Sequence, residues 1–99
     1  MPSPQSLDGL RVLDVTQVMA GPFCGMMLAD LGADVIKIEP PGGDSTRQML
    51  GATGSESAAF NSVNRGKRSV VLNLKAAGGR DALTRQARSC DIVIENYRP

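Results

Sequence analysis

The fold is decided by residues 11–39, which read RVLDVTQVMAGPFCGMMLADLGADVIKIE. Two runs rich in β-branched residues, Arg11–Thr16 and Asp34–Glu39, open and close this stretch, and both have the length of strands. A helix between them is expected to start at Pro22 and to end at Gly32, which can adopt a left-handed conformation. Four apolar residues at helical spacing predict its buried face: Phe23, Met26, Met27 and Leu31. Strand, helix and strand in succession predict parallel pairing through a right-handed crossover.

The second half of the chain repeats this pattern. Strands are predicted over 69–75 and 91–95, with a helix over 77–89 between them. The apolar stripe of that helix is narrow and consists of Leu83, Ala87 and Cys90. Two such units predict an α/β fold in which helices cover both faces of a parallel sheet. Residues 40–64, rich in Gly, Ser and Thr, are predicted to form a long loop that allows a short helix near its end, and residues 1–6 a flexible tail.

Length, charge and composition narrow the functional class. The chain has 99 residues, which make one domain at most, and its 11 basic and 10 acidic residues give a net charge of +1. Balanced charge and an aromatic content of 3% argue against binding to nucleic acid or to a membrane surface. No apolar run approaches the roughly 18 residues of a membrane span, and the first residues lack a signal-peptide pattern. We therefore expect a cytoplasmic protein with no nucleic-acid or membrane partner.

Histidine is absent from the sequence, which excludes Ser-His-Asp triads, Cys-His pairs and His-based zinc sites within this chain. The two cysteines, Cys24 and Cys90, are too far apart in sequence for a metal cluster or a CxxC redox pair. They are expected to be free thiols that are buried in packing. No metal is expected.

A ligand is expected where the strands end, because open parallel sheets bind ligands beyond their carboxyl ends. That edge receives the start of the first predicted helix at Gly21 and the cations Lys75 and Arg98. Helix amides and cations favour anions, so a phosphate-bearing, nucleotide-like ligand is predicted. A nicotinamide dinucleotide is an alternative, because Glu39 occupies the ribose-binding position. The turn after the first strand, however, lacks the G-x-G-x-x-G motif.

Five stretches of the chain, in order, carry a resemblance to a known family: Leu7–Asp14, Ala20–Cys24, Leu28–Pro41 with Gly43–Asp44, Asn64–Lys75 and Asp91–Pro99. They resemble the opening of family III CoA-transferases, the CaiB/BaiF family, with the expected spacing. The resemblance implies a Rossmann-like domain, of which this chain is the incomplete N-terminal part, and an interlocked homodimer for the full-length protein.

The same resemblance implies an enzyme that moves coenzyme A between carboxylic acids. Its partners are an acyl-CoA and a carboxylic acid acceptor. An aspartate attacks the thioester, giving a mixed anhydride and then an aspartyl-CoA thioester. The family places that aspartate well beyond Pro99, so we assign no catalytic residue here and predict that the 99-residue chain alone is inactive. Two alternatives stay open: an α-methylacyl-CoA racemase-like enzyme, and a non-catalytic nucleotide-binding module.

The resemblance also implies which residues contact coenzyme A. They follow the first strand, end the third and follow the fourth: Val18, Met19, Ala20, Leu72, Lys75, Asn96, Tyr97 and Arg98. Some members place an arginine after the Glu39 position, where this chain has Pro40, so that contact is not carried over.

Several polar residues are given structural interpretations. Asp14 is expected to make hydrogen bonds inside the first strand, and Gln17 to bond the loop backbone. Asp30 and Asp44 are expected at the surface. The basic cluster Arg65–Arg68 is interpreted as a solvated turn or as a contact to the phosphates of coenzyme A.

Overall fold

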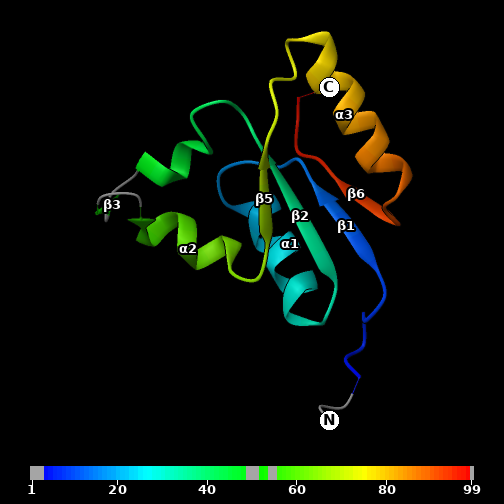
Figure 1. The fold of residues 1–99 in the computed structure, drawn as a ribbon. Helices are drawn as coiled ribbons and strands as arrows, with labels where there is room; N and C mark the ends of the chain where they lie inside the picture. Colours follow the sequence, from blue (N-terminus) through cyan, green and yellow to red (C-terminus); the bar gives the residue numbers. More distant parts are fainter. Residues whose placement is uncertain (1–3, 49–51, 54–55, 99) are drawn as a thin grey trace.

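A four-stranded parallel sheet forms the centre of the computed structural model, which describes residues 4–48, 52–53 and 56–98 (Figure 1). The strands, in the order in which they lie side by side, are β5 (Arg68–Val71), β2 (Asp34–Glu39), β1 (Arg11–Asp14) and β6 (Ile92–Ile94). The pairings β1–β2, β1–β6 and β2–β5 are parallel, which confirms the predicted class. From β1 the chain adds β2 and then β5 on one side of the sheet, and it then adds β6 on the other side of β1. The strand order therefore reverses between β1 and β6, which makes this place the switch point of the sheet.

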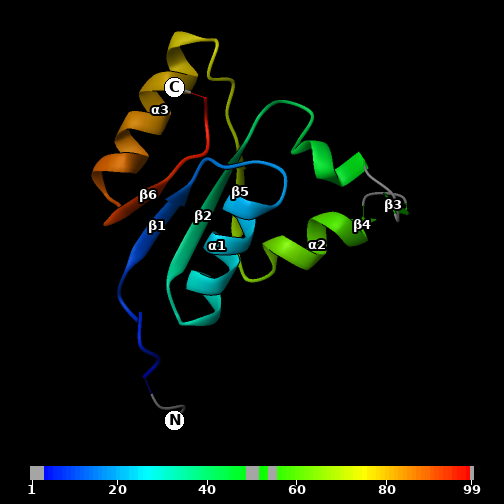
Figure 2. The same cartoon turned by 180° about the vertical axis from the view of Figure 1, so that it is seen from behind.

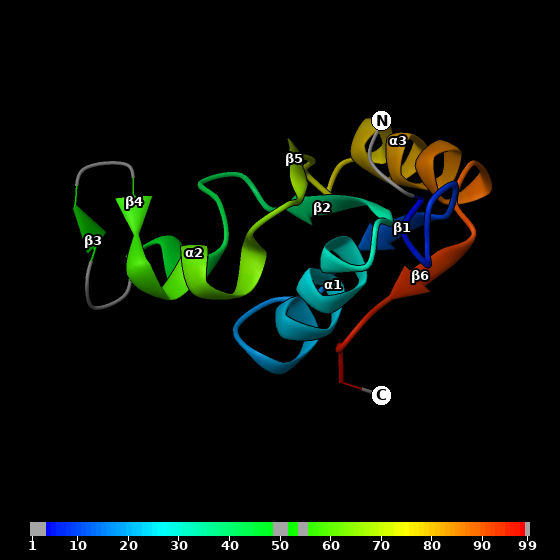
Figure 3. The ribbon, with the colours of Figure 1, turned by 90° about the horizontal axis from the view of Figure 1, so that it is seen from below.

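Helices cover both faces of the sheet, as predicted. α1 (Ala20–Asp30) lies on one face and α3 (Ala77–Arg88) on the other (Figure 3). Because successive strand residues point to opposite faces, the sheet has two apolar layers. One layer consists of Leu13, Val15, Ile36 and Ile38, and the α3 stripe Leu83, Ala87 and Cys90 packs against it. The other consists of Val12, Ala33 and Val35, and it receives Leu28 and Ala29 of α1.

The predicted buried face of α1 is wrong in three of its four positions. Met26 is 4% exposed, but the other three are about half exposed: Phe23 at 49%, Met27 at 50% and Leu31 at 48%. The helix instead turns Pro22, Gly25 and Met26 inward, because small side chains let its backbone approach the sheet closely. It begins at Ala20, before the predicted Pro22, and its last residue is Asp30; Gly32 follows the C-cap residue Leu31 and has the expected left-handed conformation, with φ 106°.

The segment between β2 and β5 is not one long loop. It contains a 3-10 helix and two short antiparallel strands, followed by the short helix that the sequence allowed. In chain order they are η1 (Ser45–Gln48), β3 (Ala52–Thr53), β4 (Glu56–Ser57) and α2 (Ala58–Asn64). They lie beyond the β5 side of the sheet (Figure 2).

The N-terminal tail predicted over 1–6 falls partly outside the described residues, which begin at 4. Within them, the Gln5 amide donates to Asp8 Oδ2 over 2.8 Å, and Leu7 N donates to Leu31 O over 2.9 Å. The first bond is local to the N-terminal segment, and the second attaches that segment to the end of α1. Among the described residues, no helix combines the length and apolar character that crossing a bilayer requires.

Candidate functional site

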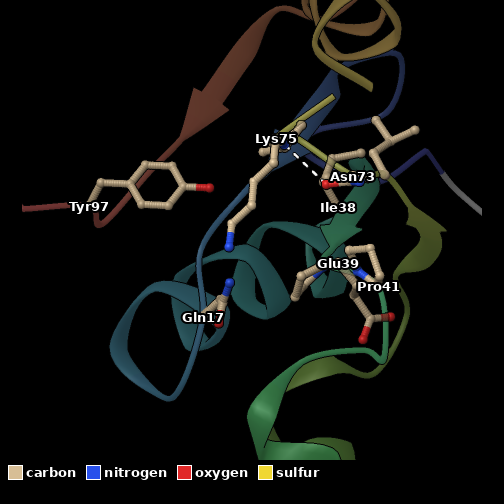
Figure 4. Close-up of a pocket in the computed structure, with 10 residues that line it drawn as sticks. Gln17, Ile38, Glu39, Pro41, Asn73, Lys75 and Tyr97 are labelled. Atoms are coloured by element: carbon tan, nitrogen blue, oxygen red, sulfur yellow. Dashed lines mark hydrogen bonds between the residues drawn. The ribbon is translucent and has the colours of Figure 1, made fainter. Parts of the chain in front are cut away.

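A pocket of about 360 Å³ opens where the strands end (Figure 4). This volume lies in the range of small-molecule sites, roughly 300–1,000 Å³. The described residues that line it follow β1, end β2, follow β5 and follow β6. They are Gln17, Ile38, Glu39, Pro40, Pro41, Leu72, Asn73, Leu74, Lys75 and Tyr97. The parallel topology therefore brings four separate segments to one edge, as the sequence predicted.

The loop after β5 supplies Lys75. β5 ends at Val71, earlier than the predicted strand end at 75, although Leu72 N still donates to Glu39 O over 3.0 Å. Asn73 then turns the chain, because its side-chain oxygen accepts a bond from Lys75 N at 3.1 Å and its carbonyl accepts one from Ala76 N at 3.1 Å. Lys75 thus lies on a hydrogen-bonded turn after β5 rather than within the strand.

Three polar side chains point into the pocket. Figure 4 shows the side chains of Lys75, Gln17 and Tyr97 directed from different segments toward one space. Lys75 is exposed, and none of the described residues forms an ion pair or hydrogen bond with its ammonium group. Most of the remaining lining is apolar: Ile38, Pro40, Pro41, Leu72 and Leu74. One uncompensated cation among apolar walls suits an organic anion.

Glu39 also borders the pocket, but its carboxylate is already paired. Arg47 holds it with two bonds of 2.6 and 2.8 Å, Asp44 N donates to it over 2.8 Å, and the Ser69 hydroxyl donates as well. Burial alone would raise the pKa of Glu39. The bonds from Arg47, Ser69 and Asp44 outweigh this effect and lower the pKa to about 2. With these bonds in place the carboxylate is not free to accept a ribose hydroxyl, which argues against the dinucleotide alternative.

Arg47 is fixed in turn by an aromatic ring. Its guanidinium carbon lies 3.7 Å from the centroid of Phe60, which belongs to α2. This contact joins η1 and α2 to the end of β2.

A set of buried ion pairs, which we call the inner charge layer, lies under the sheet edge. It consists of Asp14, Lys37, Asp44 and Lys67. Lys67 Nζ lies 2.6 Å from Asp14 Oδ2, and Lys37 Nζ lies 2.9 Å from Asp44 Oδ2. All four side chains are at most 2% exposed. Charges this deep are tolerated only when they are paired.

Hydrogen bonds complete the inner charge layer. Asp14 accepts bonds from the backbone and hydroxyl groups of Thr16, so its predicted structural role is confirmed. Lys67 also donates to Pro22 O over 2.9 Å and to Asn64 Oδ1 over 2.7 Å. Burial lowers the pKa of Lys67, against the opposing effect of Asp14.

Two of our interpretations are corrected by this layer. Asp44 was expected at the surface but is 1% exposed, because Lys37 and the Thr46 amide hold it inside. Within the basic cluster, Lys67 is not solvated but paired with Asp14, while Arg65 and Arg68 are exposed and bond Asp30 and Asp34. Asp30 is at the surface, as expected.

Gly25 makes room for the inner charge layer. A Cβ atom there would lie 2.6 Å from Asp14 Oδ2 and 3.2 Å from Lys67 Nζ. With any larger residue at this position, α1 or the ion pair would have to shift.

The loop after β1 has an unusual backbone. Val18 has φ 77°, a left-handed value that β-branched residues rarely adopt and that costs about 1–3 kcal/mol. Beside it, the side-chain amide of Asn96 bonds both backbone groups of Gln17: Nδ2 donates to the carbonyl over 2.9 Å, and Gln17 N donates to Oδ1 over 3.3 Å. The segment after β6 thus holds the backbone of Gln17 in the loop after β1.

The predicted contact residues divide into two groups. Leu72, Lys75 and Tyr97 line the pocket together. The others lie outside that lining, around the start of α1 and after β6: Val18, Met19, Ala20, Asn96 and Arg98. Asn73 and Leu74 also line the pocket, and both lie within the stretch from Leu72 to Lys75 that the resemblance implies.

The cysteines are free thiols, as predicted, but Cys24 is exposed rather than buried. It lies on the outward side of α1, because Pro22, Gly25 and Met26 take the inward one. Within the described ranges, no group of three or more His, Cys, Asp or Glu side chains is placed to hold a metal ion.

Known proteins resemble this chain over nearly its whole length. It is 51% identical over 98 residues to succinyl-CoA:mesaconate CoA-transferase of Haloarcula marismortui. The matched region covers 94% of this chain and 25% of that protein. It is 52% identical over 93 residues to acetyl-CoA:oxalate CoA-transferase of Acetobacter aceti, covering 93% and 24% respectively. The chain thus spans about a quarter of the length of these relatives.

A solved structure shares the fold of this chain. A CAIB/BAIF family protein from Brucella suis superposes with a TM-score of 0.88 at 40% identity, covering 96% of this chain and 26% of that one. The family model described as CoA-transferase family III matches residues 7–99, and the chain accordingly belongs to that family.

Proposed function

We propose that the pocket binds a phosphate-bearing part of coenzyme A, and that the protein containing these residues transfers coenzyme A between carboxylic acids. One observation carries the binding proposal: the Lys75 ammonium has no partner among the described residues and faces a pocket with mostly apolar walls. A phosphate would supply the missing counter-charge, and the apolar walls suit the carbon skeleton of the carrier.

The acceptor is proposed to be a small dicarboxylic acid. The two relatives described above are named for mesaconate and oxalate, both of which are dicarboxylic acids. In this proposal an aspartate outside the present residues attacks the thioester and carries coenzyme A between the two acids. The residues of this chain bind and orient the carrier and take no part in bond breaking.

Two further properties belong to the same proposal. Family membership supports a homodimer, and two free thiols suit the reducing cytoplasm. Val18, Met19, Ala20, Asn96 and Arg98 are proposed to border the part of the carrier that extends beyond the pocket. All five lie near the switch point between β1 and β6, where such sheets bind ligands.

Calorimetry with free coenzyme A tests the binding proposal. Lys75→Met should weaken binding about tenfold, since losing a charge-assisted bond to phosphate costs about 1.5 kcal/mol. Arg68→Met is the matched control, because Arg68 begins β5 and therefore lies at the opposite end of the strand from the pocket. Equal affinity for the wild type and Lys75→Met would exclude the lysine from the site.

Product analysis tests the reaction class. The full natural chain, given succinyl-CoA or acetyl-CoA and a dicarboxylic acid, should produce the new thioester detectably by mass spectrometry. A racemase-like enzyme would instead exchange the α-proton of a 2-methylacyl-CoA for deuterium from the solvent and transfer nothing.

A further inference from the structure

Asn96 occupies a position where its side chain extends a β-ladder. β1 and β6 pair in register from Val12 with Ile92 to Asp14 with Ile94, and Val15 N continues the ladder by donating to Ile94 O over 3.0 Å. Beyond that point the backbone pairing stops. The Asn96 amide then bonds the carbonyl and the N–H of Gln17, as a peptide group would. One side chain thus substitutes for the next rung of the ladder.

The residues on either side of these bonds matter for the pocket. Gln17 lines it from β1, and Tyr97, next to Asn96 in sequence, lines it from β6. Figure 4 shows both side chains directed toward Lys75. The Asn96 bonds therefore fix the distance between the two loops that carry these side chains.

The strained neighbour points to the same role. Val18 holds φ 77° directly after Gln17. A β-branched residue keeps such a conformation only where its surroundings enforce it. The Asn96 amide bonds both backbone groups of Gln17, the residue before Val18, and so restrains the backbone that leads into Val18.

We propose that Asn96 is a positioning residue, whose side chain affects coenzyme A binding through Gln17, Val18 and Tyr97. One N–H and the oxygen of its side-chain amide already bond the backbone of Gln17. The expected effect of Asn96 on coenzyme A binding rests on the proposed function. The conformational role of Asn96 does not.

A double-mutant cycle between Asn96→Ala and Val18→Gly tests the proposal in the full natural chain. Asn96→Ala should weaken coenzyme A binding about tenfold, because Val18 then relaxes and displaces Gln17. In the Val18→Gly background the same change should cost threefold or less, since glycine keeps a positive φ without strain. Equal fold-losses in both backgrounds would mean that Asn96 acts independently of Val18 and would overturn the proposal, as would unchanged binding by Asn96→Ala.

Amide hydrogen exchange separates this proposal from the proposed function. Without any ligand, Asn96→Ala should speed exchange at Gln17 N at least fivefold, while Val15 N, bonded to Ile94 O, stays unchanged. If coenzyme A fails to bind the wild type but this pattern appears, the binding proposal is wrong and the positioning role stands. Unchanged exchange at Gln17 contradicts the positioning role whether or not coenzyme A binds.

Discussion

Two lysines at opposite ends of strand β5 have opposite surroundings. Lys67 lies in the inner charge layer, 2% exposed, and bonds Asp14, Pro22 and Asn64. Lys75 lies at the pocket, exposed and without a charged partner among the described residues. The two residues are only eight positions apart in sequence and flank the same strand, β5.

The difference shows how to separate structural charges from ligand-binding ones. In the inner charge layer each charge has a compensating partner within the protein, as does Glu39 through Arg47. A charge that is satisfied in this way has little to offer a ligand. The lysine at the pocket is not satisfied, so it is the better candidate for binding a phosphate.

The largest effect that would test this comparison is expected from Lys67→Met. The substitution leaves Asp14, which is 0% exposed, without its counter-ion, and breaking a buried pair in this way costs about 3–5 kcal/mol. Urea denaturation measures the loss. The adjacent Arg68→Met is the control, because its pair with Asp34 is exposed and is worth about 0–1 kcal/mol. Similar losses for the two variants would abolish the distinction between inner and outer charges.

A smaller effect, with a pH signature, is expected from Glu39→Gln. The pKa of Glu39 is lowered from 4.5 to about 2 in the folded protein. Its stabilising contribution is therefore fully present above pH 4.5 and is lost as the pH falls toward 2. At neutral pH the variant should be less stable by about 2 kcal/mol, since Arg47 loses its counter-charge and one of the two oxygens that it bonds.

The check is urea denaturation at several pH values. The wild type should lose stability between pH 4.5 and about 2, and Glu39→Gln should lose less over the same interval. Parallel pH curves for the two proteins would show that this carboxylate is not held ionised by Arg47.

The strands and the ligand-binding edge could be predicted from the sequence because both depend on local pattern. Runs of β-branched residues identify strands, and parallel topology brings their ends together wherever the side chains point. Lys75 and Tyr97 were found in this way. The family resemblance added the expectation of coenzyme A.

The Asp14–Lys67 pair of the inner charge layer could not be predicted in this way, because its partners are remote in sequence. Asp14 and Lys67 are 53 residues apart, so no local pattern relates them. The buried face of α1 was predicted wrongly for another reason. Periodicity shows that Phe23, Met27 and Leu31 share one face, but it does not show that a rival face with Pro22 and Gly25 packs closer to the sheet.

Gly25→Ala is expected to have a moderate effect on the inner charge layer. The new methyl group would lie 2.6 Å from Asp14 Oδ2, so either α1 or the ion pair must shift. Overpacking of this kind costs about 1–3 kcal/mol, reduced by the better helix propensity of alanine. Thermal unfolding measures it. A variant as stable as the wild type would show that α1 can move away from the pair at no cost.

The smallest effect is expected from Lys75→Met, made as the exact counterpart of Lys67→Met. Lys75 is exposed and its ammonium has no bond to any described residue, so removing the charge should change the free energy of unfolding by at most about 0.5 kcal/mol. Urea denaturation without ligand measures this value. A loss comparable to that of Lys67→Met would mean that both lysines are structural. The pocket would then lack the uncompensated charge on which the proposed binding of coenzyme A rests.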